Sequence, residues 1–253
     1  MAVAALEVEE LRCTLGGVDA VAGVSFSVPE GPTAGLIGPN GAGKSTLVGL
    51  IAGTRLPDAG TVRLFGEDIS RLPAWRRSRL GLARTFQLSS EFARLTVLEN
   101  LMVACRDETG ETIWGALFRR RRWRAVERVH AERAWELLER FRLEHKANEQ
   151  AGLLSGGEKR MVEIMRGLMS HPQVLLLDEP MAGINPTLRD EITEYLWSLK
   201  RDGLTMIMVE HELGAVERLC DTVLVMANGR LIGQGKYSEV IEMGEVVDAY
   251  ING

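Results

Sequence analysis

The stretch Gly38-Pro39-Asn40-Gly41-Ala42-Gly43-Lys44-Ser45 decides the fold of this 253-residue chain. It matches the pattern G-x-x-x-x-G-K-[ST] at every fixed position, between an apolar run (34–37) and a helix-like run (46–52). Glycines let the backbone form a nest of inward N–H groups, and the next helix adds its positive dipole end. We therefore predict a nucleoside triphosphate site in which Lys44 contacts the β- and γ-phosphates and Ser45 is a ligand of Mg²⁺.

The alternative, a glycine-rich turn that binds nothing, is disfavoured because the full pattern occurs in a strand-loop-helix setting. The loop alone does not choose between a kinase, a GTPase, a helicase and a transporter motor. Further motifs are needed to decide between these classes.

Composition and charge narrow the class of protein. Apolar residues make up 45% of the chain and charged residues 26%, as in ordinary globular proteins. No apolar run approaches the roughly 18 residues of a membrane span, and residues 1–10 carry three glutamates and no basic residue, unlike a secretory signal. The net charge of −5 argues against nucleic acid as a partner, and three isolated cysteines are typical of a reducing cytosol. We predict a soluble cytoplasmic protein.

Sequence periodicity predicts an α/β fold. The first 70 residues are strand-rich around one helix, with strands expected at 24–28 and 61–65. Helical spacing dominates from about 89 to 150, and strands alternate with helices again afterwards. Asn228-Gly229 between two apolar runs predicts a hairpin on a type I′ turn. We expect one domain over 1–253, with a nucleotide-binding core at about 1–88 and 159–253 and a helical subdomain at 89–158.

A second motif, Val174-Leu175-Leu176-Leu177-Asp178-Glu179, is an apolar run that ends in two carboxylates. Such a run is typical of a buried parallel strand, and α/β proteins place their chemistry at the carboxyl ends of these strands. Asp178 could hold Mg²⁺, and Glu179 could polarise the water that attacks the γ-phosphate. A strand that ends in solvated acids is the alternative, which the upstream phosphate-binding loop disfavours.

The segment Leu154-Ser155-Gly156-Gly157-Glu158 separates the motor classes. Ser155 and Glu158 form the S-x-x-E capping box of a helix start, but two glycines in a first turn cost helix stability. Glycines at this position are expected if a phosphate must come close to the backbone N–H groups at the start of the helix. Together with the phosphate-binding loop and the Asp-Glu strand end about twenty residues later, the segment resembles the signature of ATP-binding cassette (ABC) ATPases.

The resemblance covers nearly the whole chain and implies a P-loop NTPase (RecA-like) core with an N-terminal antiparallel β subdomain and an inserted α-helical subdomain. It further implies that Gln87 reaches Mg²⁺ and the attacking water, and that His211 is the switch histidine that contacts the γ-phosphate. Leu15 stands where an aromatic residue usually stacks on adenine, which predicts looser base discrimination. Asn185 replaces the aspartate of the segment that crosses the dimer interface.

The residues expected to contact ATP in this chain are those of the loop with Thr46, and two positions implied by the resemblance: Gly38, Pro39, Asn40, Gly41, Ala42, Gly43, Lys44, Ser45 and Thr46, then Leu15 and Gln87. Ser45, Gln87 and Asp178 are the implied Mg²⁺ ligands, and Glu179 and His211 the implied catalytic residues. In the family, the signature residues (here Ser155, Gly156 and Gly157) complete the site of a second copy, so a homodimer or a heterodimer with a second ABC ATPase is implied.

One branch of the family resembles the chain in more detail, namely the ATPase subunits of branched-chain amino-acid importers. The resemblance lies in segments 84–87, 95–101, 182–186 and 247–251. It implies an ATPase on the cytoplasmic face of the inner membrane, bound to separate permease subunits and acting indirectly with a periplasmic or extracellular solute-binding protein. The basic run 119–124 is then a solvated helix face or a contact with anionic lipid or the permease.

Other functions stay open at this stage. ATPase subunits for urea or amide import and for lipopolysaccharide export share many of these sequence motifs. A non-transport ATP-gated clamp is less favoured, because only one phosphate-binding loop exists and Lys44 and Ser155 are 155 − 44 = 111 residues apart. A small-molecule kinase leaves the Ser155-Gly156-Gly157 segment unexplained.

Overall fold

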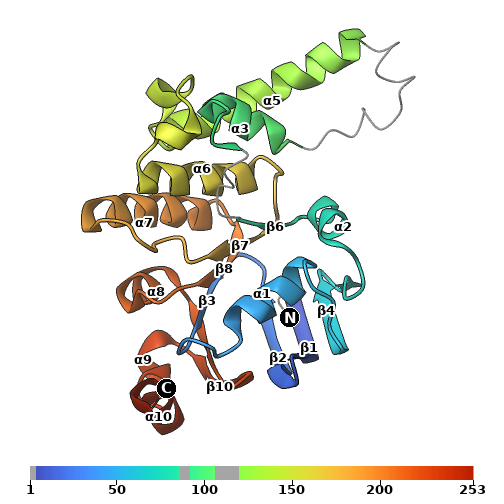
Figure 1. Cartoon of the computed structure of the whole chain (residues 1–253), viewed down its shortest axis with the longest axis vertical. Helices are drawn as coiled ribbons and strands as arrows, with labels where there is room; N and C mark the ends of the chain where they lie inside the picture. Colours follow the sequence, from blue (N-terminus) through green and yellow to red (C-terminus); the bar gives the residue numbers. More distant parts are fainter. Residues whose placement is uncertain (1–3, 86–91, 106–119, 253) are drawn as a thin grey trace. The chain divides into compact units, whose positions relative to one another are not determined.

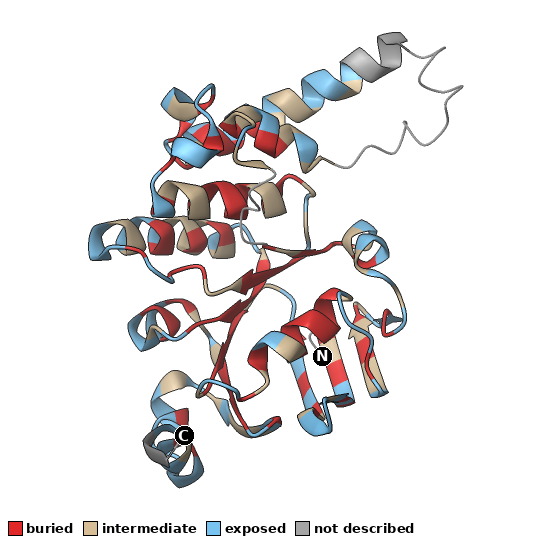
Figure 2. Cartoon of the chain, viewed as in Figure 1, coloured by how far each residue is buried: buried red, intermediate tan, exposed pale blue. Residues whose placement is uncertain are grey.

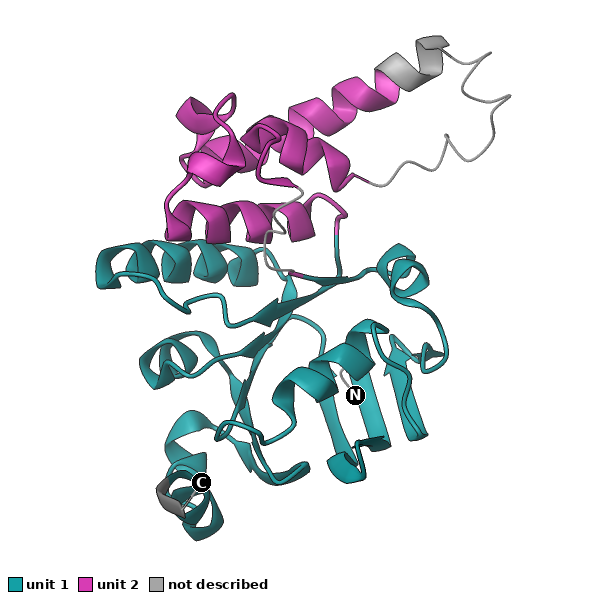
Figure 3. Cartoon of the chain, viewed as in Figure 1, with its two compact units in different colours: residues 1–84, 172–253 teal, residues 85–171 magenta. Residues whose placement is uncertain are grey.

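A computed structural model describes residues 4–85, 92–105 and 120–252. The chain divides into two compact units, one of residues 1–84 and 172–253 and the other of residues 85–171 (Figure 3). The second unit therefore extends past the sequence-based boundary at residue 158 and includes the whole of helix α6 (Gly156–Leu168).

Within its described residues, the first unit contains a six-stranded sheet of order β10-β9-β3-β8-β7-β6 (Figure 1). Its strands are β3 (Thr33–Ile37), β6 (Leu82–Arg84), β7 (Val174–Asp178), β8 (Thr205–Val209), β9 (Thr222–Ala227) and β10 (Arg230–Gly235). Pairing is parallel except between β9 and β10. Every residue of β3 and β8 is buried, as expected for parallel strands covered on both faces (Figure 2).

A second sheet of the same unit is antiparallel and has the order β2-β1-β4-β5. Its strands are β1 (Ala4–Leu15), β2 (Val18–Pro29), β4 (Ala59–Leu64) and β5 (Glu67–Asp68). This sheet is the predicted N-terminal antiparallel subdomain. With the mainly parallel sheet, it confirms the predicted α/β fold class.

The helices of the first unit are α1 (Lys44–Ala52), α2 (Ala74–Arg79), α7 (Pro186–Arg201), α8 (Leu213–Leu219), α9 (Tyr237–Val240) and α10 (Gly244–Asn252). Leu47, Leu50 and Ile51 of α1 belong to one buried cluster with residues from both sheets. Helix α1 therefore lies between the sheets (Figure 1), which fixes the phosphate-binding loop at its N-terminus.

The far end of α1 is held by Arg77, a fully buried residue of α2. Its guanidinium donates hydrogen bonds to the carbonyl oxygens of Leu50 (2.6 Å), Ile51 (2.7 Å), Leu72 (2.8 Å) and Ser70 (2.8 Å). The last carbonyls of a helix lack partners within the helix, so this cation satisfies two of them and complements the negative dipole end.

The hairpin β9–β10 turns at Asn228 and Gly229, whose φ angles are +49° and +74°. Positive φ at both central residues defines the predicted type I′ turn.

In the second unit the described elements are α3 (Val97–Val103), α5 (Arg120–Arg140), η2 (Glu144–Lys146), η3 (Ala151–Leu153) and α6. Helix α3 begins with a capping box in which Thr96 accepts from the Glu99 N–H and Glu99 accepts from the Thr96 N–H. The apolar face of α5 contributes Ala134, Leu137 and Leu138 to the buried side, as the helical spacing predicts, and Phe141, directly after the helix, is buried with them.

Candidate functional site

A pocket of about 220 Å³ opens around the N-terminus of α1. Ala20, Asn40, Gly41, Ala42, Gly43, Lys44, Ser45, Thr46, Glu179 and His211 line it. The loop after β3 thus meets residues that follow β8, the strand beside β3 in the sheet, and β7, the strand next to β8. The carboxyl ends of adjacent parallel strands lie at one edge, which is where α/β proteins place their ligands.

Two positions of the loop must be glycine because the backbone of neighbouring strands lies too close to leave room for a Cβ atom. A Cβ on Gly43 would lie 2.1 Å from the Ala20 carbonyl oxygen, and one on Gly38 would lie 2.0 Å from that of Met226. Their φ angles, +100° and +146°, are also disfavoured for residues with side chains. The loop is therefore fixed against β2 and β9.

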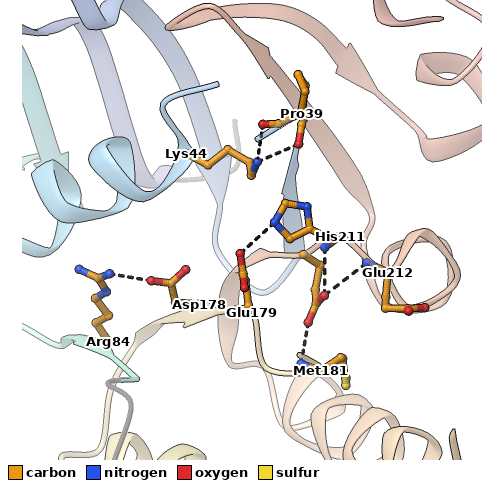
Figure 4. A network of polar contacts seen from close by, with 10 residues as sticks. Pro39, Lys44, Arg84, Asp178, Glu179, Met181, His211 and Glu212 are labelled. Atoms are coloured by element: carbon orange, nitrogen blue, oxygen red, sulfur yellow. Dashed lines mark hydrogen bonds and ion pairs between the residues drawn. The ribbon is translucent and has the colours of Figure 1, made fainter. Parts of the chain in front are cut away.

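Lys44 lies in the pocket with only 6% of its surface exposed. Its Nζ donates to the carbonyl oxygens of Gly38 (2.8 Å) and Pro39 (2.9 Å), as Figure 4 shows. Burial lowers the pKa of Lys44, and the nearby negative charge of Glu179 opposes this shift in part. A buried ammonium bonded to two neutral carbonyls is poorly compensated, so an anion entering the pocket would be stabilised.

Glu179 and His211 contact each other across the pocket. His211 Nε2 lies 2.9 Å from Glu179 Oε1, and both side chains are about two-fifths exposed (43% and 41%) (Figure 4). The backbone of Glu179 has a φ of +48°, a left-handed conformation that costs a non-glycine residue on the order of 1 kcal/mol or more. Strain of this kind gathers at functional sites, because surrounding contacts hold it in place.

Asp178 is paired with Arg84, a residue to which sequence reasoning gave no role at the site. Arg84 Nη2 lies 2.6 Å from Asp178 Oδ2, and both side chains are mostly buried. The residues come from adjacent parallel strands, since β6 pairs with β7. The one signal for this contact is that Arg84 ends β6, the strand that pairs with β7, and β7 ends at Asp178.

Ser155 and its glycines lie in the second unit, at the start of α6. Ser155 Oγ accepts from the Glu158 N–H (3.4 Å) and Glu158 Oε2 from the Ser155 N–H (2.8 Å), so the predicted capping box is present. Burial raises the pKa of Glu158, but the hydrogen bonds from Ser155 and the charges of Lys146 and His145 together outweigh it and leave that pKa lowered. A Cβ on Gly156 would meet no atom within 4 Å, so packing within the described chain does not require glycine there.

Comparison with known proteins places these motifs in a family. The family model described as ABC transporter matches residues 21–182. The chain belongs to the ABC transporter family.

Relatives of this ABC transporter subunit match along almost its whole length. It is 36% identical over 246 residues to the probable branched-chain amino acid transport ATP-binding protein LivG of Archaeoglobus fulgidus, covering 97% of this chain and 95% of that one. It is 40% identical over 249 residues to Nod factor export ATP-binding protein I of Ralstonia nicotianae, covering 97% and 72%. A crystal structure of an ABC transporter's ATP-binding cassette in its ADP conformation shares 34% identity and a TM-score of 0.85 over 99% of both chains.

These relatives confirm the predicted family, fold and enzyme class: the chain is an ATP-hydrolysing subunit of an ABC transporter. No helix in the described part of the chain is long and apolar enough to cross a membrane.

Not every residue expected at the ABC site is found in the pocket. Leu15 is half-buried at the end of β1 and packs against the core, and it is not among the pocket-lining residues. Its contact with adenine stays a prediction. Gln87 lies outside the described residues, as do the side chains of the basic run 119–124. Asn185 is the N-cap of α7, and its Oδ1 accepts from the Leu188 N–H at 2.9 Å.

Sequence reasoning missed Ala20, which lines the pocket from β2. A small apolar residue in a strand carries no motif, so nothing in the sequence marked it.

The residues of this pocket fit a nucleotide and its cation. Lys44 supplies an incompletely compensated positive charge, and the exposed Ser45 supplies a hydroxyl at the N-terminus of α1. Carboxylate and hydroxyl oxygens are the ligands that Mg²⁺ prefers. Ser45 is a suitable donor within the pocket, whereas Asp178, the predicted carboxylate ligand, is not among the pocket-lining residues and is paired with Arg84.

Proposed function

We propose that this chain binds and hydrolyses ATP to drive uptake of branched-chain amino acids through separate membrane permease subunits. The observation that carries the proposal is the pocket in which the phosphate-binding loop, Glu179 and His211 converge. The relatedness to LivG supports the choice of solute. Export is the second candidate, because the Nod factor export protein is 40% identical. Urea or amide import, lipopolysaccharide export and a non-transport clamp remain less favoured.

In this proposal the loop amides and Lys44 bind the phosphates of ATP. Entry of the triphosphate gives the buried ammonium an anionic partner, so Lys44 can exchange the carbonyls of Gly38 and Pro39 for phosphate oxygens. Ser45 and Asp178, with Gln87, would hold Mg²⁺, which when bound neutralises charge that develops on the phosphates. The Arg84–Asp178 contact must then loosen or share Asp178 with the cation.

Glu179 would act as the general base. Its carboxylate points into the pocket and can accept a proton from the attacking water. His211 contacts that carboxylate through Nε2 and orients it, and would turn its one ring N–H toward the γ-phosphate once the nucleotide is present. The two residues are then the catalytic pair of this chain.

A second subunit would complete the site. Ser155, Gly156 and Gly157 present a capped helix start in which Gly156 leaves open space. We propose that this segment contacts the γ-phosphate held by a partner copy, or by a related ATPase subunit, in an ATP-dependent dimer. Because ADP lacks the γ-phosphate, ATP favours the closed state. Binding to a permease would place the chain at the cytoplasmic face of the inner membrane.

The chemistry is tested with Glu179→Gln, which keeps the side chain's size and removes its basicity. We expect ATP binding to persist while hydrolysis falls by about 10²–10⁴-fold and an ATP-dependent dimer accumulates in light scattering. Hydrolysis at the original rate would remove Glu179 from its proposed role, and persistent monomers in the presence of the permease would remove the dimer.

The choice of solute is tested in the source strain with the gene deleted. Wild-type chain should restore uptake of radiolabelled leucine, and Glu179→Gln should not. Normal leucine uptake in the deletion strain would contradict the import proposal, and a simultaneous loss of Nod factor export would favour the second candidate.

A further inference from the structure

Glu210 is a buried carboxylate that the proposed chemistry does not use. It directly precedes His211 at the end of β8, and only 2% of its surface is exposed. A buried carboxylate is costly unless its oxygens are hydrogen-bonded. The bonds that it makes therefore indicate what it holds in place.

Those bonds join two separate segments. Glu210 Oε1 accepts from the Met181 N–H at 2.7 Å, while Oε2 accepts from the N–H groups of His211 (3.1 Å) and Glu212 (3.4 Å) (Figure 4). Met181 lies two residues after Glu179, and His211 carries the imidazole that contacts Glu179. One carboxylate thus binds the backbone beside each member of the Glu179–His211 pair.

The backbone around Glu210 strengthens this connection. The Glu179 N–H donates to the Val209 carbonyl oxygen at 2.9 Å, and the Glu210 N–H donates to that of Leu36, in the strand that leads to the phosphate-binding loop. The Ala182 N–H donates to the Glu179 carbonyl oxygen at 3.1 Å, which closes the turn where Glu179 has positive φ. In that turn the Met181 N–H is satisfied by Glu210.

We propose that Glu210 is a positioning residue that fixes Glu179 and His211 relative to each other for ATP hydrolysis. The inference rests on the proposed roles of those two residues. Burial raises the pKa of Glu210 even though three N–H groups oppose the shift, so the fold keeps this carboxyl at an electrostatic cost. Groups held at such a cost gather at functional sites.

The test is Glu210→Gln, because glutamine keeps the shape but has one amide oxygen. Whichever way the amide is turned, its NH₂ faces an N–H donor, either that of Met181 or those of His211 and Glu212. One segment is then released. We expect kcat for ATP hydrolysis to fall by about 10- to 100-fold, the loss typical of a small displacement of reacting groups. KM for Mg-ATP should stay within about twofold, because Glu210 does not line the pocket.

Glu217→Gln is the matched control, since Glu217 is an exposed carboxylate on the following helix α8. It should hydrolyse ATP at the wild-type rate. If Glu210→Gln does not yield folded protein, Glu210→Asp replaces it, because the carboxylate is kept but shortened by one methylene and can no longer reach both segments. The same fall in kcat is expected.

A double-mutant cycle with His211→Ala separates positioning from general destabilisation. If Glu210 acts through the pair, the fold-losses of Glu210→Gln and His211→Ala should combine to clearly less than their product. Independent multiplication, or unchanged kcat, would overturn the inference. The Glu179→Gln variant distinguishes failure of the proposed function from failure of the positioning role of Glu210. If Glu179→Gln still hydrolyses ATP, the proposed function fails. If Glu179→Gln is inactive while Glu210→Gln is fully active, only the positioning role fails.

Discussion

Replacing Arg77 with methionine should destabilise the first unit strongly. The guanidinium is fully buried and donates four hydrogen bonds of 2.6–2.8 Å to backbone carbonyls, two of them at the end of α1. Burial lowers the pKa of Arg77 to about 10, and the charge of Asp68 opposes the shift. The charge therefore carries a desolvation cost that its hydrogen bonds must exceed.

The magnitude follows from what the substitution leaves behind. Hydrogen bonds from charged donors contribute about 1.5–3 kcal/mol each, and methionine leaves four buried carbonyl oxygens without that donor. Removal of the desolvation cost offsets part of the loss. We therefore expect the free energy of unfolding to fall by about 3–5 kcal/mol, less than the sum of four such hydrogen bonds.

Urea unfolding followed by circular dichroism measures this change directly. Arg76→Met is the matched control, because Arg76 is the preceding residue of α2, is exposed and stacks on Trp75. It should cost less than about 1 kcal/mol. A loss of under 1 kcal/mol for Arg77→Met as well would refute the assignment of Arg77 as the residue that holds the end of α1.

Three further outcomes are expected. Without nucleotide, the free energy of unfolding of Lys44→Met should stay within about 1 kcal/mol of the wild-type value, because burial penalises the charge of Lys44 and lowers its pKa. If Mg-ATP still raised the melting temperature of this variant as much as that of the wild type, the role of Lys44 would be contradicted. Gly43→Ala should weaken ATP binding about tenfold or more in calorimetry, since its Cβ would meet the Ala20 oxygen, whereas Gly41→Ala, with no atom within 4 Å, should be milder. Burial raises the pKa of the Cys220 thiol from 9.0 to about 12, so the unfolded chain loses this proton first and stability falls as the pH rises above about 9. In Cys220→Ala, the free energy of unfolding measured by urea titration should fall less steeply above pH 9, by about 1.4 kcal/mol per pH unit. The same pH slope in the variant and the wild type would contradict this role of Cys220.

Local pattern was sufficient for elements whose packing is simple. Strand β8 and helix α8 lie in the part of the chain where strands were expected to alternate with helices. Strand β8 is an unbroken apolar run, and α8 is a short amphipathic helix. Strand β1 was not predicted in detail. Its register shifts between Val8 and Leu11, and Glu10 has a φ of +46°, so the bulge breaks the period-2 pattern that identifies a strand.

At the site, the motifs and the resemblance predicted most of the residues that line the pocket but not those that hold them in place. Lys44 from the loop motif, Glu179 from the strand-end motif and His211 from the family resemblance meet in one pocket. Arg77 could not be told from the other arginines of α2, and Arg84 and Glu210 had no pattern of their own. Their roles depend on which strands become neighbours, and that is set by the folded chain.

The left-handed backbone at Glu179 has a consequence for how stability and turnover trade against each other. Only glycine, and to a lesser degree asparagine or aspartate, adopts such a φ readily. Replacing the acid with glycine should therefore relieve local strain and make a hydrolysis-dead protein more resistant to heat than the active one. The chain would then be an example of an enzyme whose working residue lowers its own thermal tolerance.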